Sequence, residues 1–381
     1  MPFKAETDAR LLRPGRAGLP LWCDHFLAPP GSGDIFSGRA WYDTVLGHAL
    51  PPGAEPVLAV CGANDEMLVP LLRQGGRLRS MVTPYSLEWR ALPARGADTA
   101  ALRDAGRGLA QVLRGSAPIR LEAMDPAAPG MAAWLAGLRH GGMALGPFRH
   151  FGNWRQVLEP GAGWAGYLAA RPPTMRNTIQ RKLARAAREF TFVQSTAPGA
   201  GLERGIADFV AVRGRSWKPE EPFPHFDAAL LRAMAAIGAL RLGVLRGAGD
   251  VAVAAQYWLV DGGRAHLLKL VHDEAAAAAS PGTALTALMI RALIENDAVA
   301  ELDFGRGDDA YKRLWVTERR QRVGMMVTDP WHPAGLIELA RQGVSRGRRL
   351  LRGAGWKPAD GDLFPPPETG SRASPAEPVR A

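Results

Sequence analysis

Apolar residues in the second half of the chain follow the period of strands first and of a helix afterwards. Residues 240–245, 251–260 and Arg264–His272 are apolar-rich runs of strand length. Short glycine-containing segments at 247–250 and 261–263 separate them, and turns of this composition favour hairpins. The pattern predicts an antiparallel meander of three strands.

A helix and a short strand are predicted after the meander. Residues 283–296 carry apolar side chains at a spacing of about 3.6 residues, and residues 299–304 return as a strand. The helix opens with Ser-Pro-Gly-Thr, and the free N–H groups and dipole of such a helix start favour a phosphate. We therefore expect an anion site beside the sheet, formed by Ser280, Gly282, Thr283 and Ala284.

The residues around this helix carry a family resemblance. The ordered set is Ala255-Gln256, then 269–273 (Lys-Leu-Val-His-Asp), then Ser280-Pro281-Gly282, then Asp303-Phe304-Gly305-x-Gly307-x-x-x-Tyr311-Lys312-x-x-Trp315. It resembles the GNAT-type acyltransferases grouped with the CelD-like proteins of cellulose and exopolysaccharide clusters. Those proteins are similar in turn to the Fem-type peptidoglycan aminoacyltransferases. The similarity covers most of residues 20–325.

The resemblance implies a tandem GNAT architecture whose C-terminal copy binds an activated acyl donor, with no permanently bound cofactor. One departure bears on the donor. GNAT proteins usually present Gln/Arg-x-x-Gly-x-Gly/Ala to the pyrophosphate of CoA, whereas the matching frame here begins with Ala279 and keeps only Gly282 and Ala284. Backbone amides can still hold a pyrophosphate. Acyl-CoA, an acyl carrier protein and an aminoacyl-tRNA all stay open as donors.

We expect an α/β (α+β) fold of two GNAT-like lobes in tandem, with mixed central sheets flanked by helices. A polar arm at 1–20 precedes an N-terminal lobe at 21–160 and a C-terminal acyltransferase lobe at 161–325. In the first lobe the pattern predicts strands at 56–60, 66–72, 78–83, 119–124 and 142–145 and helices at 100–113 and 131–138. This half shows no Gly-rich phosphate loop, so we assign it to acceptor binding and support.

A basic amphipathic helix is predicted at 175–190, between the lobes. Its basic residues include Arg176, Arg181 and Arg185, and no acidic residue occurs from 171 to 188. This face is either a solvated helix surface or a docking surface for an anionic donor, carrier protein or acceptor.

Two residues beyond the last strand are candidates for catalysis. Lys312 follows the Asp-Phe-Gly turn, where a cation could stabilise an oxyanion or neutralise a phosphate. The Fem-type resemblance also implies a functional lysine there. Asp303 could orient or deprotonate an acceptor amine, or could instead cap the following turn. We assign Tyr311 and His225, which lies in a Pro-rich loop, to acceptor or anion docking.

Other polar and aromatic residues are interpreted structurally. By strict alternation, His266 and His272 share one strand face and are expected to be packed. Trp217 is expected to be an aromatic anchor in the core. The sequence contains no Gly-x-Ser-x-Gly nucleophile elbow, and the zinc-like spacing of His266 and His272 lacks a Cys-x₂-Cys companion. Direct transfer in a ternary complex is therefore the simpler mechanism.

The amino-acid composition limits the number of domains and indicates which kinds of partner the protein binds. The 381 residues are 47% hydrophobic, enough for two cores, and the net charge is +10. Such a charge favours CoA phosphates, acidic carrier proteins, anionic lipid or nucleic acid, but we find no stacking platform or helix-turn-helix for specific nucleic-acid binding. Cys23 and Cys61 give neither a disulfide framework nor a metal site, and we expect both to be buried. No apolar run approaches the ~20 residues that span a bilayer, so we expect a cytoplasmic protein.

The C-terminal segment 326–356 is predicted to hold a basic amphipathic helix. Apolar residues gather on one side of 336–352 and arginines on the other, between Trp331 and Trp356. Two interpretations stay open, an interfacial helix at the inner membrane or a helix docked on the second lobe. The Pro- and Gly-rich tail at 357–381 is expected to be disordered.

The sequence thus predicts an acyltransferase that moves an acyl group from acyl-CoA or an acyl carrier protein to an amine, on a lipid or cell-envelope precursor. A hydroxyl acceptor in exopolysaccharide or cellulose biosynthesis is the close alternative. A non-catalytic binding module with the same fold is the alternative of another class.

Overall fold

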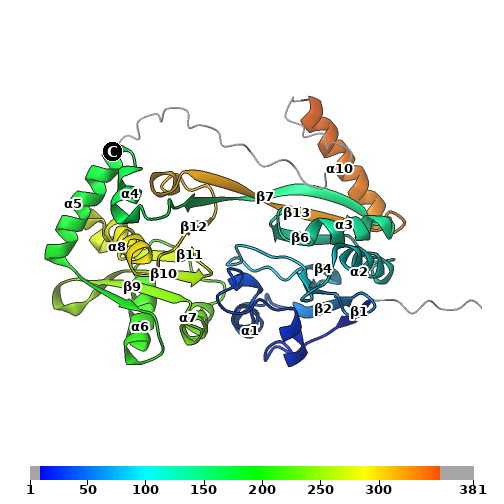
Figure 1. Ribbon diagram of the computed structural model, residues 1–381, viewed down its shortest axis with the longest axis horizontal. Coiled ribbons are helices and arrows are strands. Elements are labelled where there is room, and N and C mark those ends of the chain that lie inside the picture. The colour runs from blue at the N-terminus through cyan, green and yellow to red at the C-terminus, as the bar shows by residue number, and fades with distance from the viewer. Residues whose placement is uncertain (1–8, 352–381) are drawn as a thin grey trace, which may run out of the picture.

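The computed structural model describes residues 9–351, with side chains described through residue 344. These residues fold around one mixed sheet of 13 strands. The strand order is β1-β2-β3-β4-β6-β13-β7-β12-β11-β10-β9-β8, and β5 pairs with β3. Helices cover both lobes of the sheet (Figure 1). The mixed α/β class is confirmed, but the sheets of the two lobes are joined edge to edge.

The first lobe follows the predicted pattern of strands and helices closely. Its elements are β1 (Ala9–Leu12), α1 (Arg39–His48), β2 (Glu55–Cys61), β3 (Met67–Gln74), β4 (Arg77–Ser80), β5 (Leu92–Pro93), α2 (Thr99–Val112), β6 (Ile119–Met124), α3 (Met131–His140) and β7 (Ala144–Val157). The prediction did not include α1, and it placed only the start of β7.

The second lobe contains the predicted meander, helix and return strand. Its elements are α4 (Gly163–Ala169), α5 (Pro173–Glu189), β8 (Thr191–Ser195), α6 (Ala200–Gly214), α7 (Phe226–Ala236), β9 (Leu240–Arg246), β10 (Ala252–Asp261), β11 (Arg264–His272), α8 (Pro281–Glu295), β12 (Glu301–Arg306), α9 (Lys312–Trp315), β13 (Glu318–Thr328) and α10 (Pro333–Leu351). Antiparallel pairing of β10 with both β9 and β11 confirms the meander.

Strands β7 and β13 connect the lobes. β13 pairs with β7 from Glu318↔Arg155 to Thr328↔Ala144, and with β6 on its other edge. In Figure 1 this long pair runs from one lobe to the other. The expected lobe boundary at residue 325 therefore falls inside a strand that belongs to the sheet of the first lobe.

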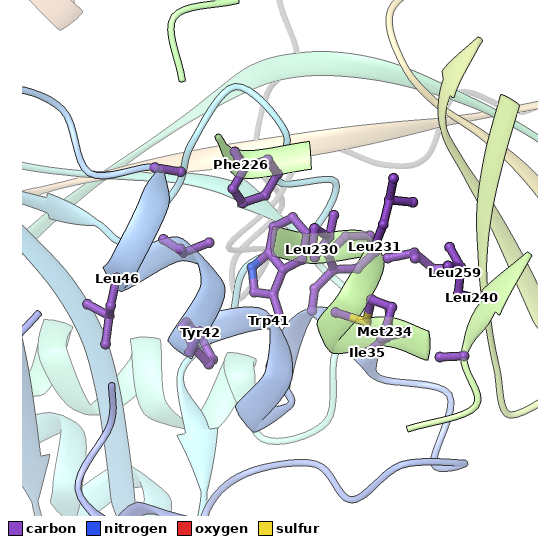
Figure 2. Close-up of a cluster of buried hydrophobic side chains, with 14 of the residues drawn as sticks. Ile35, Trp41, Tyr42, Leu46, Phe226, Leu230, Leu231, Met234, Leu240 and Leu259 are labelled. Carbon is purple, nitrogen blue, oxygen red and sulfur yellow. The ribbon is translucent and has the colours of Figure 1, made fainter. Parts of the chain in front are cut away.

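Three buried apolar clusters hold the sheet and helices together. One lies between α2, α3 and the first-lobe strands, and another lies under α4, α5 and α8. The third joins the lobes, because α1 packs against α7 (Figure 2). There the Trp41 ring meets the Phe226 ring edge to face at 5.9 Å. Cys23 and Cys61 are buried and unpaired, as predicted.

Helix α10 lies beside the first lobe. Gln342 meets the backbone of β7 at Gly146, where a Cβ atom would be 2.0 Å from Gln342 Oε1. The expectation that this helix docks on the second lobe is therefore wrong. The predicted arm at 1–20 is not wholly without structure, because Ala9–Leu12 forms strand β1 and pairs with β2. Residues 1–8, Trp356 and the tail at 357–381 lie outside the described residues.

Candidate active site

The central feature of the second lobe is a split in the sheet between β11 and β12. These parallel strands pair only at Arg264↔Glu301, Ala265↔Leu302 and His266↔Asp303. Beyond that point β12 turns away through Gly305 (φ 70°) and Gly307 (φ 103°), a left-handed backbone that glycine adopts without strain. The split opens into a cavity of about 690 Å³.

A β-bulge in β11 shapes the same cavity. Its register with β10 shifts between Tyr257↔Lys269 and Trp258↔Leu267, so Leu268 is an extra residue. An extra residue moves the following side chains to the other face. His266 accordingly packs on Phe36, with ring centroids 5.2 Å apart, whereas His272 lines the cavity. The prediction that both histidines share one face is wrong for this reason.

The cavity is lined by residues from both faces of the sheet. On one face of the sheet, side chains of α5 and α8 line the cavity, next to the apolar cluster that contains Phe304. On the other face, Tyr85 of the first lobe lines it together with Tyr257, which belongs to the apolar cluster that joins the lobes. Residues lining the first side include Met175, Gly282, Thr283, Thr286 and Trp315. Two substrates could therefore approach the split from opposite faces.

The start of α8 forms one end of the cavity. Ser280, Gly282 and Thr283 line it, and no acidic residue occurs in the first turn of the helix. The backbone N–H groups of Ser280, Thr283 and Ala284 are already donated, to Ala277 O (2.8 Å), Ser280 O (3.1 Å) and Ser280 O (3.3 Å), and the side chain of Ala284 is buried. Of the four residues predicted to hold phosphate, Gly282 therefore has the amide that is free to meet a ligand, while Ala284 has neither a free amide nor an exposed side chain.

Asp303 lies at the last paired residue before the split and is fully buried. Its carboxylate accepts hydrogen bonds from Asn153 Nδ2 (2.6 Å), Gly305 N (2.7 Å) and Arg320 Nη2 (2.5 Å). Burial alone would raise its pKa, but the His266 ring, whose Nδ1 lies 3.5 Å from the carboxylate, and the charge of Arg320 hold the pKa far below its ordinary value. Such a carboxylate is a poor proton acceptor, so its geometry favours a positioning role over the predicted role of base.

Lys312 lies at the cavity wall but is buried, with 3% of its surface exposed. Its Nζ donates to Arg306 O at 2.6 Å and lies 3.1 Å from Asp309 Oδ2. The lysine therefore holds the backbone turn that follows β12 and is not an exposed surface lysine.

Lys218, which the sequence analysis did not single out, lies at the open edge of β11. Its Nζ donates to Leu270 O at 2.6 Å. That carbonyl therefore faces the cavity, and because N–H and C=O of one strand residue point to the same side, the amide N–H of Leu270 faces it too. Desolvation, together with the cations Arg213 and Lys269, lowers the pKa of Lys218 to about 8.

A polar network that sequence analysis also missed crosses the cavity between the lobes. Tyr85 donates to Glu221 at 2.7 Å, and Lys269 Nζ lies 2.8 Å from Glu221 and 2.7 Å from Asp227. Tyr257 completes the network by donating to Asp227 at 2.6 Å. These residues are far apart along the chain, so no local motif marks them.

The remaining predicted residues differ in whether they line the cavity. Tyr311 lines it and is 42% exposed; desolvation and the charge of Asp309 raise the pKa of its phenol to about 12. Arg176, Arg181, Arg185 and His225 are not among the described residues that line it. Trp217 is 54% exposed and lies over the His272 ring at 4.3 Å, so its prediction as a core anchor is wrong.

Residues 9–351 contain neither a membrane-spanning helix nor a cluster of metal ligands. No helix there is long and apolar enough to cross a membrane. No cluster of three His, Cys, Asp or Glu residues there has the geometry of a metal site.

Known proteins agree with this geometry at the level of the fold. Residues 173–313 match the acetyltransferase (GNAT) domain family. No curated protein matches the sequence. Among solved structures, L-PGS from Bacillus licheniformis is 12% identical with a TM-score of 0.54, over 89% of this chain and 99% of that chain. FemX is 11% identical with a TM-score of 0.54, over 84% of this chain and 98% of that chain.

A third similar structure is the C-terminal DUF2156 domain of a protein named as a lysylphosphatidylglycerol synthetase, from Agrobacterium fabrum. It is 13% identical with a TM-score of 0.52, over 85% of this chain and 94% of that chain. At these identities the likeness concerns the fold. The family match lies on the lobe that holds the split sheet and its cavity. The second lobe thus carries a GNAT acetyltransferase domain, and the prediction of a GNAT-type acyltransferase is confirmed.

Proposed function

We propose that the protein is an N-acyltransferase that moves an acyl group from acyl-CoA to a primary amine by direct attack in the cavity between β11 and β12. The observation that carries this proposal is the split itself, which is open to both faces of the sheet and bordered by a strand edge with unpaired backbone groups. Such an arrangement lets a donor and an acceptor meet without a covalent enzyme intermediate.

In this reaction the thioester carbonyl lies against the amide N–H of Leu270, which polarises it. The amine nitrogen attacks the carbonyl carbon, so that a C–N bond forms while the C–S bond breaks. The amine loses one proton and the departing thiolate gains one. Tyr311 is the candidate donor for the second transfer, because it lines the cavity and its phenol is protonated at neutral pH.

The start of α8 supports CoA as the donor. Gly282 leaves room for a ligand there, since a Cβ atom would lie 3.2 Å from the His272 ring. The helix dipole and the absence of acidic residues in the first turn favour a pyrophosphate. An acyl carrier protein is the alternative donor. Arg176, Arg181 and Arg185 of α5 would suit its acidic surface, because Met175 and Thr178 of the same helix line the cavity.

Release of CoA thiol from acetyl-CoA in the presence of a panel of primary amines tests the proposal. We expect amine-dependent thiol release and an acylated amine by mass spectrometry. Saturable CoA binding with no thiol release for any amine or acyl chain would support the non-catalytic binding module instead. Release with glycans that lack an amine would support the O-acyltransferase of exopolysaccharide or cellulose biosynthesis, in keeping with the CelD-like resemblance.

We further propose that the acceptor belongs to a lipid or another envelope precursor reached at the inner membrane. Helix α10 and the tryptophan that precedes it support this proposal, because Trp331, before the helix, and Ile337 and Val344, within it, are 89%, 71% and 58% exposed. The same helix carries Arg341 and further arginines in sequence, a composition that suits an anionic leaflet. Co-sedimentation with anionic vesicles should fall when the chain is truncated after Pro330. Equal binding by both proteins, or by neither, removes the membrane contact.

A further inference from the structure

Lys218 differs from the other lysines of the cavity in its electrostatic partners. Lys269 is paired with Glu221 and Asp227, and Lys312 is paired with Asp309. Lys218 makes no ion pair with any carboxylate in residues 9–344, and its recorded hydrogen bond goes to a neutral carbonyl, Leu270 O.

The surroundings of Lys218 make this missing partner conspicuous. Its side chain is half-buried, and desolvation together with the nearby cations Arg213 and Lys269 lowers the pKa of its ammonium group, against the smaller opposite effects of Glu221 and Asp309. Glu221, an acid of the same loop, is already bonded to Arg213, Lys269 and Tyr85. A desolvated cation without a counterion is unfavourable, and an anionic ligand would relieve that cost.

From these contacts we infer that Lys218 binds a carboxylate or phosphate group of the acceptor, next to the amine that is acylated. The inference rests on the proposed function and names the acceptor class, an amine that also carries an oxyanion. The acceptor is favoured over the donor because the donor phosphates already have the start of α8. Lys218 instead lines the same cavity as Tyr85 of the first lobe, and it lies near enough to Glu221, the hydrogen-bond acceptor of Tyr85, for the charge of Glu221 to act on it.

Matched pairs of acceptors test this inference. Glycine is compared with glycinamide, and phosphoethanolamine with ethanolamine, by calorimetric binding and by thiol release from acetyl-CoA. We expect the anionic member of at least one pair to bind about 10- to 100-fold more tightly, the range of a charge-assisted hydrogen bond. The pair that shows the preference separates carboxylate from phosphate.

Three variants of the full chain complete the design. Lys218→Gln should abolish the preference for the anionic acceptor, and Lys218→Arg should restore part of it. Arg204→Gln, which removes a cation from α6 outside the cavity, should keep it. Equal binding of anionic and neutral acceptors by the unmodified protein would overturn the inference. A fall in CoA affinity for Lys218→Gln would also overturn it, because the lysine would then serve the donor.

The two proposals can fail separately. Thiol release without any preference for anionic acceptors would remove the inference and leave the acyltransferase. Calorimetric preference that depends on Lys218, without thiol release for any amine, would keep the oxyanion site and remove the proposed reaction.

Discussion

Both lobes contain a strand-helix-strand connection, but the two strands are joined by a third strand in the first lobe and separate in the second. In the first lobe β6 leads through α3 to β7, and β13 lies between the two strands and pairs with both. In the second lobe β11 leads through α8 to β12, and no strand lies between them. The first junction is closed by a strand from the C-terminal part of the chain, while the second parts after three pairs and forms a cavity.

This difference teaches that the open strand edge, rather than the connection itself, makes the site. In the closed junction the space is filled: a Cβ on Gly324 of β13 would lie 2.1 Å from the Phe148 ring. In the open junction the carbonyl of Leu270 meets only a lysine side chain. The closed junction also supports the open one, because Asn153 of β7 and Arg320 of β13 both bond Asp303 at the start of the split.

The largest expected effect comes from breaking that support. Asp303→Asn removes one of the two buried carboxylates that pair with Arg320, the other being Glu301 at 3.4 Å, and breaking a buried pair destabilises by up to about 3–5 kcal/mol. Because the pKa of Asp303 is lowered on folding, its contribution to stability is present above the unfolded pKa near 4 and is lost as pH falls below it. Denaturant unfolding at several pH values should show a smaller acid dependence in the variant. A fall in turnover with unchanged stability would favour a catalytic base after all.

Lys312→Ala should weaken the turn that opens the split. The side chain is buried and donates to Arg306 O, so we expect a loss of about 1–3 kcal/mol in the free energy of unfolding. If Lys312 were exposed and catalytic, its removal would instead lower turnover and leave the stability unchanged. Lys182→Ala on α5 serves as the matched control, with an expected change within about 0.5 kcal/mol. Equal stability of the two variants would show that the buried contacts of Lys312 contribute little.

Gly282→Val tests the donor end of the cavity with little effect on the rest. The added side chain would meet the His272 ring and narrow the start of α8, so CoA affinity measured by calorimetry should fall at least about tenfold, or 1.4 kcal/mol. Gly201→Val in the first turn of α6 is the control, because open space surrounds its Cβ position. Unchanged CoA affinity in the Gly282 variant would place the phosphates elsewhere.

The sequence predicts the open junction better than the closed one. The meander and α8 have regular apolar periods, so β9, β10, β11 and α8 could be predicted. β13 begins with Glu-Arg-Arg-Gln-Arg, which has no strand-like alternation. Its arginines are bonded to acids such as the buried Asp303 and the half-buried Asp125. A charged strand of this kind is stabilised by partners that are distant in sequence, and a local pattern cannot reveal them.

The candidate site was predictable only in part, for related reasons. Gly282 and Tyr311 stand in local motifs and do line the cavity. Lys218 lies in an aperiodic loop, and its importance depends on Leu270 and Arg213 in the folded chain. The bulge at Leu268 changes the side of His272 without any glycine or proline to mark it. Long-range contacts therefore decide which residues of the split can meet a substrate.

The smallest expected effect sharpens the comparison from the side of stability. Lys218→Met should raise the melting temperature of the ligand-free protein by about 2–4 °C, because it removes a desolvated cation without a counterion and keeps an apolar stem of similar length. Because folding lowers the pKa of Lys218 from 10.5 to about 8, the unfolded chain binds more protons between these values. The free energy of unfolding of the unmodified protein should therefore rise with pH across that window, and its difference from that of Lys218→Met should shrink there. The charged neighbours of Lys218 are Arg213, Lys269, Glu221 and Asp309. A melting temperature below that of the unmodified protein at pH 7 would mean that the bond to Leu270 outweighs desolvation, and Lys218 would then be a structural clamp of the open edge.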